Sequence, residues 1–437
     1  MTANHYDAIV IGGGLAGAIT ARILSEQRYR TLVIEKQARL GQNNLSLRNA
    51  RGETFDQGYH ALDENRSPFT TRFFTKVLGG RCHRLRLQRG IVIRGHLFDF
   101  NAPVAEWPAA LAKEFPASEI EDNLENAPTR DALAGVYGAP FANLAFNEIL
   151  PSYPGLLWMR DHGVPEEKLL GLIYPWFFPR ARRPARAQDE SARFHAAARQ
   201  SGEQHILYPD EGGFGAFIEG IVQGIDGQFA EVRTKVMDIQ CRLESGTTRI
   251  ASVQHDGVTS TADHYFWCAP VTGLAKLAGL RVPTLHPQKL ALGSYSFDRE
   301  VACEYHEILV GDPQIPIGRI SFPGRIGNGR NHLVQVEQLF PAKFKEVDGE
   351  IWREECLESF RRLGIVAREA EVEHYDCTIE SRGFVSVEDL HATVEDYRVS
   401  FARPDSNITI PHLGLGPENI NRVVPSVFRT VYERITQ

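Results

Sequence analysis

The opening of the chain carries a glycine pattern that could bind the diphosphate of a dinucleotide. A short β-branched run, residues 8–11, leads directly into Gly12, Gly14 and Gly17. In this spacing the first glycine permits a tight turn, the second lets a diphosphate approach the backbone, and the third lets a helix pack closely on the strand. The amino-terminal end of that helix then attracts the negative charge. The alternative is a glycine-rich turn that binds nothing.

One acidic residue indicates which nucleotide the turn would accept. After the helix, a second apolar run at residues 31–34 ends in Glu35. A carboxylate about twenty residues after the glycines accepts hydrogen bonds from ribose hydroxyls and repels the 2′-phosphate of NADP. The strand, the glycine turn, the helix and the acidic strand end agree with one another, so the segment predicts a βαβ unit that binds a dinucleotide.

The same segment resembles the FAD-binding start of a known clan of flavoproteins. Residues 6–17, 32–36 and 40–41 are similar to the corresponding segments of the amine oxidase, protoporphyrinogen oxidase and UDP-galactopyranose mutase clan. The resemblance implies that the dinucleotide is FAD. The chain departs from the clan at Gln42, where a second glycine is usual. By position, the implied cofactor-binding residues in this segment are Gly12, Gly14, Leu15, Ala16, Gly17, Glu35, Lys36, Gly41 and Gln42.

Residues 55–60 resemble the clan's second signature, in which a glycine and a nearby residue lie against the isoalloxazine ring. Gly58 and His60 occupy these two places, and the histidine is most similar to the mutase branch. An imidazole beside a flavin can both donate and accept a hydrogen bond at N5 or O4, which makes His60 a candidate catalytic residue. The alternative is a loop histidine without a task.

Later segments resemble the returns of the chain to the FAD-binding domain in this clan. Residues 208–218 are similar to the tyrosine-proline and double-glycine motif that precedes a returning helix, and the segment at Val236 meets the adenine in the clan. Near the carboxyl terminus, the clan places a glycine turn beside the FAD diphosphate and a helix against the flavin pyrimidine. That position implies cofactor contacts for Gly414, Gly416, Asn419 and Ile420.

Arginines are the main candidates for substrate contacts. A hairpin similar to residues 89–100, which include Arg94, carries substrate-facing groups in the mutase-like branch. Four arginines lie within residues 180–186, and their guanidinium groups could bind a carboxylate or diphosphate through paired hydrogen bonds. Arg319 lies where strands of the clan's enzymes face the substrate, which makes it a candidate catalytic residue. A solvated position is the alternative for these arginines. The substrate-binding candidates are Arg94, Arg180, Arg182 and Arg183.

The wider pattern predicts the elements that position these residues. Residues 109–198 have a helical pattern broken by prolines, as in an inserted lobe, and residues 288–340 alternate between apolar and polar side chains, as in antiparallel strands. We therefore expect an α/β fold with a doubly wound, Rossmann-like FAD-binding domain and a mixed-sheet substrate domain. The expected FAD-binding domain comprises residues 1–85, 205–285 and 400–437, and the substrate domain comprises residues 86–204 and 286–399, including the helical lobe 109–198.

The composition excludes several classes of protein. Of the 437 residues, 43% are hydrophobic and 24% are charged, which is typical of a globular chain rather than a disordered or integral membrane protein. The formal net charge of −7 argues against a nucleic-acid partner. The six cysteines form no CxxC pair, and the amino terminus resembles neither a signal peptide nor a membrane span. We therefore expect reduced thiols, no metal site and a cytoplasmic protein.

Three functions are open on the sequence alone. The first is a flavin oxidoreductase, in which a small-molecule substrate gives a hydride to flavin N5. The second is a non-redox sugar-nucleotide mutase that uses reduced FAD as a nucleophile, although residues 293–297 lack the tyrosine-arginine strand motif of the mutases. The third is a flavin-binding protein with a structural role, because no catalytic acid or base stands out. We expect the oxidoreductase, and the arginines would favour an anionic substrate.

Overall fold

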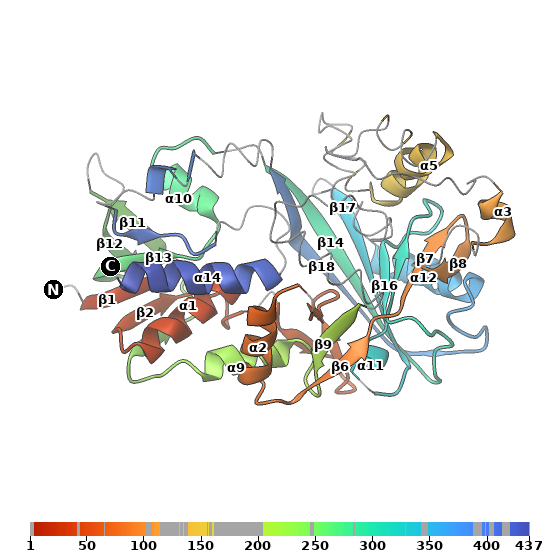
Figure 1. Ribbon diagram of the computed structural model, residues 1–437, viewed down its shortest axis with the longest axis horizontal. Coiled ribbons are helices and arrows are strands. Elements are labelled where there is room, and N and C mark those ends of the chain that lie inside the picture. Colours follow the sequence, from red (N-terminus) through yellow and green to blue (C-terminus); the bar gives the residue numbers. More distant parts are fainter. Residues whose placement is uncertain are drawn as a thin grey trace.

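Two large β-sheets lie at opposite ends of an elongated molecule in the computed structural model (Figure 1). The structure describes residues 4–41, 44–64, 66–100, 107–113, 131, 134, 139–154, 156, 160, 204–244, 249–282, 285–327, 329–341, 348–387, 396–397, 399–401, 406–412 and 420–436. Within these residues the predicted fold class, a Rossmann-like α/β sheet together with a mixed sheet, is confirmed. Most of the predicted helical lobe at residues 109–198 lies outside the described residues.

The first sheet joins strands from distant parts of the chain. Its parallel strands are β10 (Ala230–Arg233), β2 (Thr31–Ile34), β1 (Asn4–Ile11), β13 (Val258–Trp267) and β19 (Ile408–Thr409). The antiparallel strands β12 (Ile250–His255) and β11 (Ile239–Leu243) follow beyond β13. The order is β10-β2-β1-β13-β12-β11, and β19 also pairs with β13. Segments from the beginning, the middle and the end of the chain therefore meet in one sheet.

Helices cover both faces of the first sheet, as a doubly wound fold requires. The helices on one face are α1 (Leu15–Glu26), α2 (Pro68–Val77), α9 (Gly215–Gln223) and α14 (Ile420–Ile435), and α10 (Val271–Leu277) lies on the other face (Figure 1). Strand β1 alternates between the two cores. Ala8 and Val10 belong to the core with α1, whereas Ile9 and Ile11 belong to the core with α10. Burial on both sides explains why the second half of this strand, residues 8–11, is uniformly apolar.

The second sheet is mixed and comes mainly from the second half of the chain. Its strands, in spatial order, are β18 (Val372–Val387), β14 (Leu285–Phe297), β17 (Leu333–Pro341), β16 (Arg319–Ser321), β15 (Glu307–Val310), β7 (Arg89–Ile93) and β8 (His96–Asp99). Neighbouring strands are antiparallel except β15 and β7. Helix α12 (Gly349–Arg362) packs on this sheet through Trp352 and Phe360. The antiparallel strands predicted in residues 288–340 and the hairpin predicted at residues 89–100 are confirmed.

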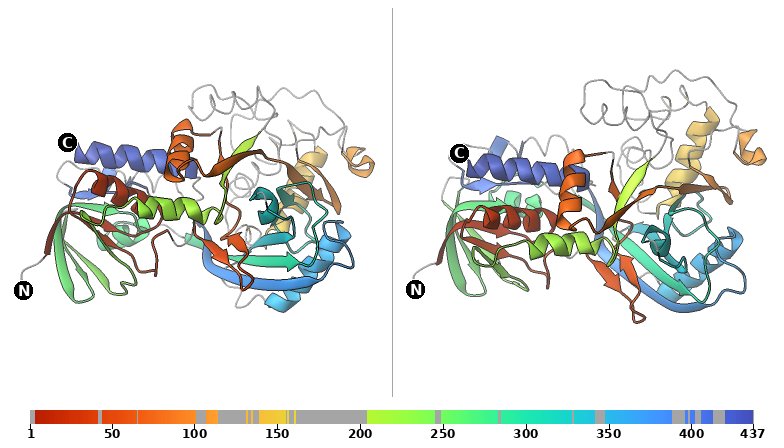
Figure 2. Two further views of the ribbon diagram at one scale, coloured as in Figure 1. Left: turned by 90° about the horizontal axis from the view of Figure 1, so that it is seen from below. Right: turned by 60° about the horizontal axis from the view of Figure 1, so that its bottom comes forward.

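Short elements complete the described structure. The hairpin of β3 (Ser46–Arg48) and β4 (Thr54–Asp56) lies at the junction of the two sheets (Figure 2). A three-stranded sheet contains β5 (Leu62–Asp63), β9 (His205–Pro209) and β6 (Cys82–Arg86), and α11 (Pro323–Ile326) follows β16. The described helical pieces of the predicted lobe are α3 (Ala109–Ala112), α5 (Ala139–Leu144) and the turns Ala145–Ile149 and Leu150–Ser152. Among the described helices, none combines the length and the apolar composition needed to cross a membrane.

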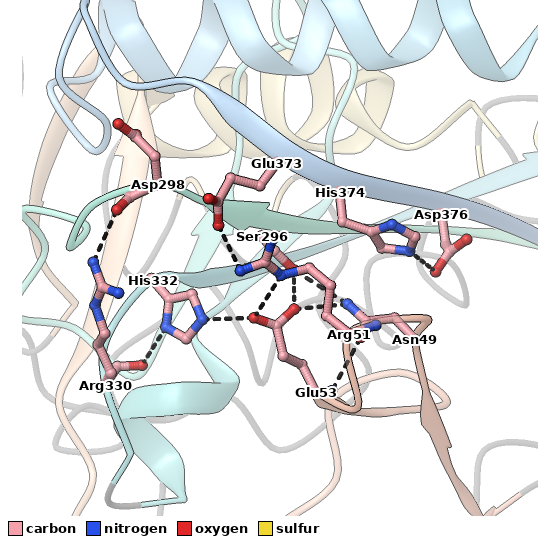
Figure 3. Close-up of polar contacts among 10 residues, drawn as sticks. All are labelled: Asn49, Arg51, Glu53, Ser296, Asp298, Arg330, His332, Glu373, His374 and Asp376. Atoms are coloured by element: carbon pink, nitrogen blue, oxygen red, sulfur yellow. Dashed lines mark hydrogen bonds and ion pairs between the residues drawn. The ribbon is translucent and has the colours of Figure 1, made fainter.

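A polar cluster attaches the tip of the β3–β4 hairpin to the second sheet (Figure 3). The Glu53 carboxylate accepts hydrogen bonds from Asn49 Nδ2 at 2.7 Å and from the Ser296 hydroxyl on β14. Its other oxygen lies 2.8 Å from His332 Nε2, immediately before β17. Burial by itself would raise the pKa of Glu53, but the hydrogen bonds from Ser296, Asn49 and His332 lower it to about 2. Ionised Glu53 therefore stabilises the contact between hairpin and sheet.

We expect Glu53→Gln to destabilise the protein in a pH-dependent way. Hydrogen bonds to a charged group contribute about 1.5–3 kcal/mol, so the free energy of unfolding should fall by roughly this amount at pH 7. The pKa of Glu53 is about 2 in the folded protein and has an ordinary value of 4.5. The contribution of the carboxylate is therefore fully present above pH 4.5 and is lost as the pH falls toward 2. Urea unfolding of both proteins across this range measures the difference.

Glu373→Gln is the matched control for this prediction. Glu373 Oε2 pairs with Arg51 Nη2 at 2.7 Å in the same cluster, but the two side chains are 36% and 44% exposed. An exposed ion pair contributes about 0–1 kcal/mol. A Glu53 variant whose loss of stability matched the control, or did not shrink at low pH, would contradict the role given to Glu53.

Candidate functional site

The glycine turn lies where β1 ends, and two of its glycines are required by packing. Gly12 has φ +97°, and a Cβ atom there would lie 2.6 Å from the Ala269 backbone nitrogen. A Cβ atom on Gly17 would lie 1.9 Å from the Gly12 carbonyl oxygen. Helix α1 can therefore start directly against the turn only because both residues lack a side chain. These two positions maintain the local fold, whatever binds beside them.

Gly14 differs from the other two glycines because it faces open space. A Cβ atom on Gly14 would meet no atom of the described residues within 4 Å. Gly14 is also the N-cap residue of α1, where no side chain caps the helix and no acidic residue lies in the first turn. The free first-turn amides, beginning with Leu15 and Ala16, are therefore directed toward a position that favours an anion. The turn has both the room and the polarity that a diphosphate needs.

Glu35 and Val236 lie beside this turn, at the end of β2. The Glu35 carboxylate accepts hydrogen bonds at 2.6 Å from the amides of Gly13 and Gln37. The Val236 amide donates to the Glu35 carbonyl oxygen at 3.1 Å, and the Val236 side chain is buried. The fold thus brings together two predicted cofactor-binding residues that are 200 positions apart in the chain. The carboxylate is half-buried next to the glycine turn.

The remaining residues predicted to bind the cofactor do not all lie at the glycine turn. Lys36 is exposed. Gly41 has φ +70°, and its amide donates to the Gly13 carbonyl oxygen at 2.7 Å, so it lies against the turn. Ile420 begins α14 and packs against the core of the first sheet. The other predicted cofactor-binding residues, which are Gln42, Gly414, Gly416 and Asn419, lie outside the described residues.

Gly58 and His60 lie at the junction between the two sheets, shortly after the β3–β4 hairpin. Gly58 has φ +90°, which favours glycine at this turn. The His60 ring stacks on Phe214, with centroids 5.5 Å apart and planes inclined by 25°. Its Nδ1 lies 3.0 Å from the Gly58 carbonyl oxygen and its Nε2 lies 3.4 Å from Asn44 Nδ2. This arrangement suits an Nδ1–H group that donates to the Gly58 carbonyl oxygen and an Nε2 atom that accepts from the Asn44 amide.

A buried carboxylate next to this segment explains the motif at residues 208–218. Asp56 accepts hydrogen bonds from the Ser46 hydroxyl at 2.5 Å, the Tyr208 hydroxyl at 2.7 Å and the Phe214 amide at 2.9 Å. Burial raises the pKa of Asp56, and the bonds from Ser46 and Tyr208 oppose that change. A Cβ atom on Gly213 would lie only 2.4 Å from the Ser46 hydroxyl oxygen. The tyrosine and the double glycine therefore allow α9 to approach the hairpin.

Arg319 belongs to a cluster of charged side chains on the second sheet. This cluster lies next to the segment that contains Gly58 and His60. Arg319 Nη1 is 3.8 Å from Glu337 Oε1, and Arg319 Nε is 3.9 Å from Glu307 Oε2. Glu307 also accepts a hydrogen bond from Arg89 Nε at 2.6 Å. The guanidinium carbon of Arg319 lies 5.5 Å from the centre of the Tyr59 ring. Its side chain is 18% exposed, so Arg319 is directed inward rather than into bulk solvent.

Tyr59 connects this charged group to the turn at Gly58. Its backbone amide donates to Glu337 Oε1 at 2.5 Å. Its hydroxyl oxygen is buried and has no hydrogen-bond partner among the residues that the structure describes. Burial raises the pKa of Tyr59 well above its usual value, so the hydroxyl keeps its proton. A buried hydroxyl without a partner is energetically costly and is a suitable donor to a bound molecule.

Of the four arginines predicted to bind substrate, Arg94 is the one that lies within the described residues. Arg94 occupies the turn between β7 and β8, with φ +49°. Its guanidinium donates to both carboxylate oxygens of Glu148, at 2.7 and 2.6 Å. Arg94 therefore supports the edge of the second sheet in this structure. Arg180, Arg182 and Arg183 lie outside the described residues.

The segment that contains the glycine turn matches a known protein family. The family of NAD(P)-binding Rossmann-like domains matches residues 10–77, which extend from β1 to the end of α2. A flavin-containing amine oxidase of Danio rerio is 29% identical over 107 residues, which are 24% of this chain and 20% of that protein. The matched stretch thus spans about one fifth of the length of that relative.

Solved structures extend the likeness to the whole chain. A protein of Exiguobacterium sp. 255-15 assigned as a protoporphyrinogen oxidase superposes with a TM-score of 0.69 and 15% identity, and 100% of both chains is covered. The chain has the fold of the amine oxidase-like clan. A reduced UDP-galactopyranose mutase superposes with a TM-score of 0.60 and 14% identity over 87% of this chain and 84% of that one. The resemblance of residues 6–17 to this clan is thereby confirmed.

In this amine oxidase-like fold the predicted residues form two groups. The glycine turn, Glu35 and Val236 meet at the carboxyl ends of the parallel strands, where open α/β sheets bind their ligands. The second group lies at the junction of the sheets, where the turn at Gly58 meets Arg319. Four residues of the second group were not predicted from the sequence, and these are Asp56, Tyr59, Glu307 and Glu337. For Asp56 and Tyr59 a signal existed, because both lie inside the signature at residues 55–60.

Proposed function

We propose that the protein binds FAD and catalyses the oxidation of a small organic molecule. One observation carries the cofactor assignment: the turn at Gly14 is open while the first turn of α1 lacks both a side-chain cap and an acidic residue. A diphosphate fits such a place. The half-buried Glu35 carboxylate next to it fits a ribose whose hydroxyls donate hydrogen bonds. The likeness to a flavin-containing amine oxidase supports FAD as the dinucleotide.

The residues of the chain would take distinct tasks around the cofactor. FAD, when bound, supplies a ring that accepts a hydride from the substrate. Gly58 and His60 would lie against that ring, and the contacts with Phe214 and the Gly58 carbonyl oxygen would orient the His60 imidazole there. Arg319 would face the substrate from the second sheet, and the Tyr59 hydroxyl would face it from the turn next to Gly58. The cofactor contacts proposed for Gln42, Gly414, Gly416 and Asn419, and the substrate contacts proposed for Arg180, Arg182 and Arg183, belong to the same proposal.

The two sheets suggest how the chain is divided between these tasks. We assign residues 1–85, 205–285 and 400–437 to an FAD-binding domain, and residues 86–204 and 286–399 to a substrate domain. The strands of the first sheet fall in the first set of segments. The contact between β3–β4 and the second sheet would then keep the cofactor and the substrate at a constant distance.

Glu35→Ala should weaken FAD binding by about 1.5–3 kcal/mol, the contribution of hydrogen bonds to a charged group. This corresponds to a dissociation constant raised roughly 10- to 150-fold in an equilibrium titration of the apoprotein. Glu26→Ala is the control, because Glu26 is 43% exposed at the far end of α1. An unchanged dissociation constant for the Glu35 variant would remove this carboxylate from the nucleotide site.

A specific observation also supports a second function. The fold matches that of a UDP-galactopyranose mutase, and Gly58 and His60 lie at the junction between the sheets. A mutase of this kind would rearrange a sugar nucleotide without net oxidation and would need reduced FAD. We favour the oxidoreductase because the protein assigned as a protoporphyrinogen oxidase superposes on the whole chain, and with a higher TM-score than the mutase.

Anaerobic spectroscopy separates the two functions. The purified protein, saturated with FAD, is mixed without oxygen with a panel of aliphatic and aromatic amines and then with UDP-galactopyranose. An oxidoreductase should lose its flavin absorbance near 450 nm, stoichiometrically with one organic substrate. Conversion of UDP-galactopyranose only after reduction by dithionite would instead establish the mutase. A protein that binds no added FAD would overturn both functions.

A further inference from the structure

Strand β17 contacts the segment before His60 at three points. Each contact joins one residue at or just before β17 to one residue of the segment, and all three are short polar contacts between parts of the chain that are about 280 positions apart. The pairs are His332 Nε2 with Glu53 Oε1 at 2.8 Å, Gln335 Nε2 with the Asp56 carbonyl oxygen at 2.7 Å, and the Tyr59 amide with Glu337 Oε1 at 2.5 Å. Figure 3 shows the first of them. The second sheet therefore determines where this segment lies.

Glu337 makes the contact nearest to the turn. Its carboxylate accepts the Tyr59 amide, and a Cβ atom on Gly58 would lie 3.6 Å from its Oε1. The same oxygen is 3.8 Å from Arg319 Nη1. The Glu337 side chain is 14% exposed. One carboxylate thus touches both the backbone of the turn and the candidate substrate-facing arginine.

Among the described residues, the charged side chains next to Glu337 form a balanced set. Two guanidinium groups, of Arg89 and Arg319, face two carboxylates, of Glu307 and Glu337. The Glu307 side chain is only 2% exposed, and both arginine side chains are less than one fifth exposed. Electrostatic interactions are stronger where water is largely excluded. Removing the Glu337 charge would therefore leave an excess positive charge beside Gly58 and Tyr59.

We propose that Glu337 is a positioning residue for the flavin reaction. It holds the Gly58–Tyr59 backbone through the Tyr59 amide, and it supplies the negative charge that balances Arg319 at that place. The inference rests on the proposed function, because it requires FAD beside the turn. A fixed charge near the flavin changes the relative affinity for oxidised and reduced FAD, since reduction makes the ring more electron-rich. Glu337 thus couples the substrate side of the site to the redox equilibrium of the cofactor.

The backbone contact can be tested without FAD by hydrogen–deuterium exchange of the apoprotein. Glu337→Ala removes both the acceptor and the charge, so the amides in the peptide that contains Tyr59 should exchange at least about tenfold faster. Glu337→Gln keeps an acceptor oxygen for the Tyr59 amide, so its exchange should stay near that of the unmodified protein. Glu350→Gln is the control, because Glu350 is a 77% exposed carboxylate on α12. Unaltered exchange in Glu337→Ala would overturn the inference.

The charge effect is tested in the FAD-bound protein by measuring the flavin reduction potential. In Glu337→Gln, reduced FAD should bind at least about tenfold tighter relative to oxidised FAD than in the unmodified protein. For a two-electron couple this is a rise of about 30 mV. Glu350→Gln should leave the potential unchanged. An unchanged potential in Glu337→Gln would overturn the inference while the proposed function stands, whereas absence of FAD binding in the unmodified protein would overturn the proposed function itself.

Discussion

Gly14→Val should weaken FAD binding at least a hundredfold while the protein stays folded. A hundredfold change corresponds to about 2.8 kcal/mol of binding free energy. The new side chain would occupy the open space in front of the first turn of α1, where the diphosphate is proposed to lie. Its Cβ atom would meet no atom of the described residues within 4 Å, and the φ of −61° at Gly14 suits any residue. Fluorescence titration of the apoprotein with FAD measures the effect.

Stability measurements distinguish this effect from misfolding. Replacing a glycine N-cap by valine should lower the free energy of unfolding of the apoprotein by no more than about 1 kcal/mol. Urea unfolding of the apoprotein tests this directly. Unchanged affinity for FAD in a folded Gly14 variant would place the diphosphate elsewhere, and a large loss of stability would show that the space at Gly14 is needed by the protein itself.

In contrast to Gly14→Val, Gly17→Ala should strongly lower the free energy of unfolding. The methyl group would lie 1.9 Å from the Gly12 carbonyl oxygen, which is backbone and cannot rotate away. Either α1 moves from the turn or the turn changes shape, and overpacking of this kind costs about 1–3 kcal/mol or more. We expect the upper end of this range, about 3 kcal/mol, because the methyl group would meet the backbone of Gly12, which directly follows β1. Urea unfolding of the apoprotein is again the measurement.

A glycine in open surroundings provides the control for Gly17. Gly227 lies in the turn before β10, and a Cβ atom there would meet nothing within 4 Å. Gly227→Ala should change the free energy of unfolding by less than about 0.5 kcal/mol. Equal effects at positions 17 and 227 would contradict the close approach between α1 and the turn.

The βαβ unit could be recognised from sequence because its geometry depends on neighbouring residues. The tight turn at Gly12 and the close approach at Gly17 both occur within one short segment. Burial on both faces makes residues 8–11 of β1 continuously apolar, which is visible without any tertiary information. The alternation in residues 288–340 likewise predicts antiparallel strands, and β14, β16 and β17 have that arrangement.

The surroundings of the second group of residues could not be recognised in this way. Asp56 receives its donors from the hairpin, from β9 and from the turn before α9. Arg319 has Glu307 and Glu337 as neighbours because β15 and β17 both pair with β16. Arg94 pairs with Glu148, which is 54 positions away in the chain, and nothing in its local sequence indicates that partner. Side-chain type alone does not show which partner the fold brings within reach.

The sequence by itself therefore determined the glycine turn, the Rossmann-like sheet and the resemblance to the amine oxidase-like clan. Each depends on backbone conformation and on apolar periodicity, which are properties of short segments. Only the tertiary structure decided that β17 contacts the segment from Glu53 to Tyr59, and that Glu337 lies between that segment and Arg319. These contacts join residues about 280 positions apart. A buried polar side chain needs a hydrogen-bond partner, but the residues next to it in the sequence do not show which partner that is. The packing of the two sheets decides the pairing.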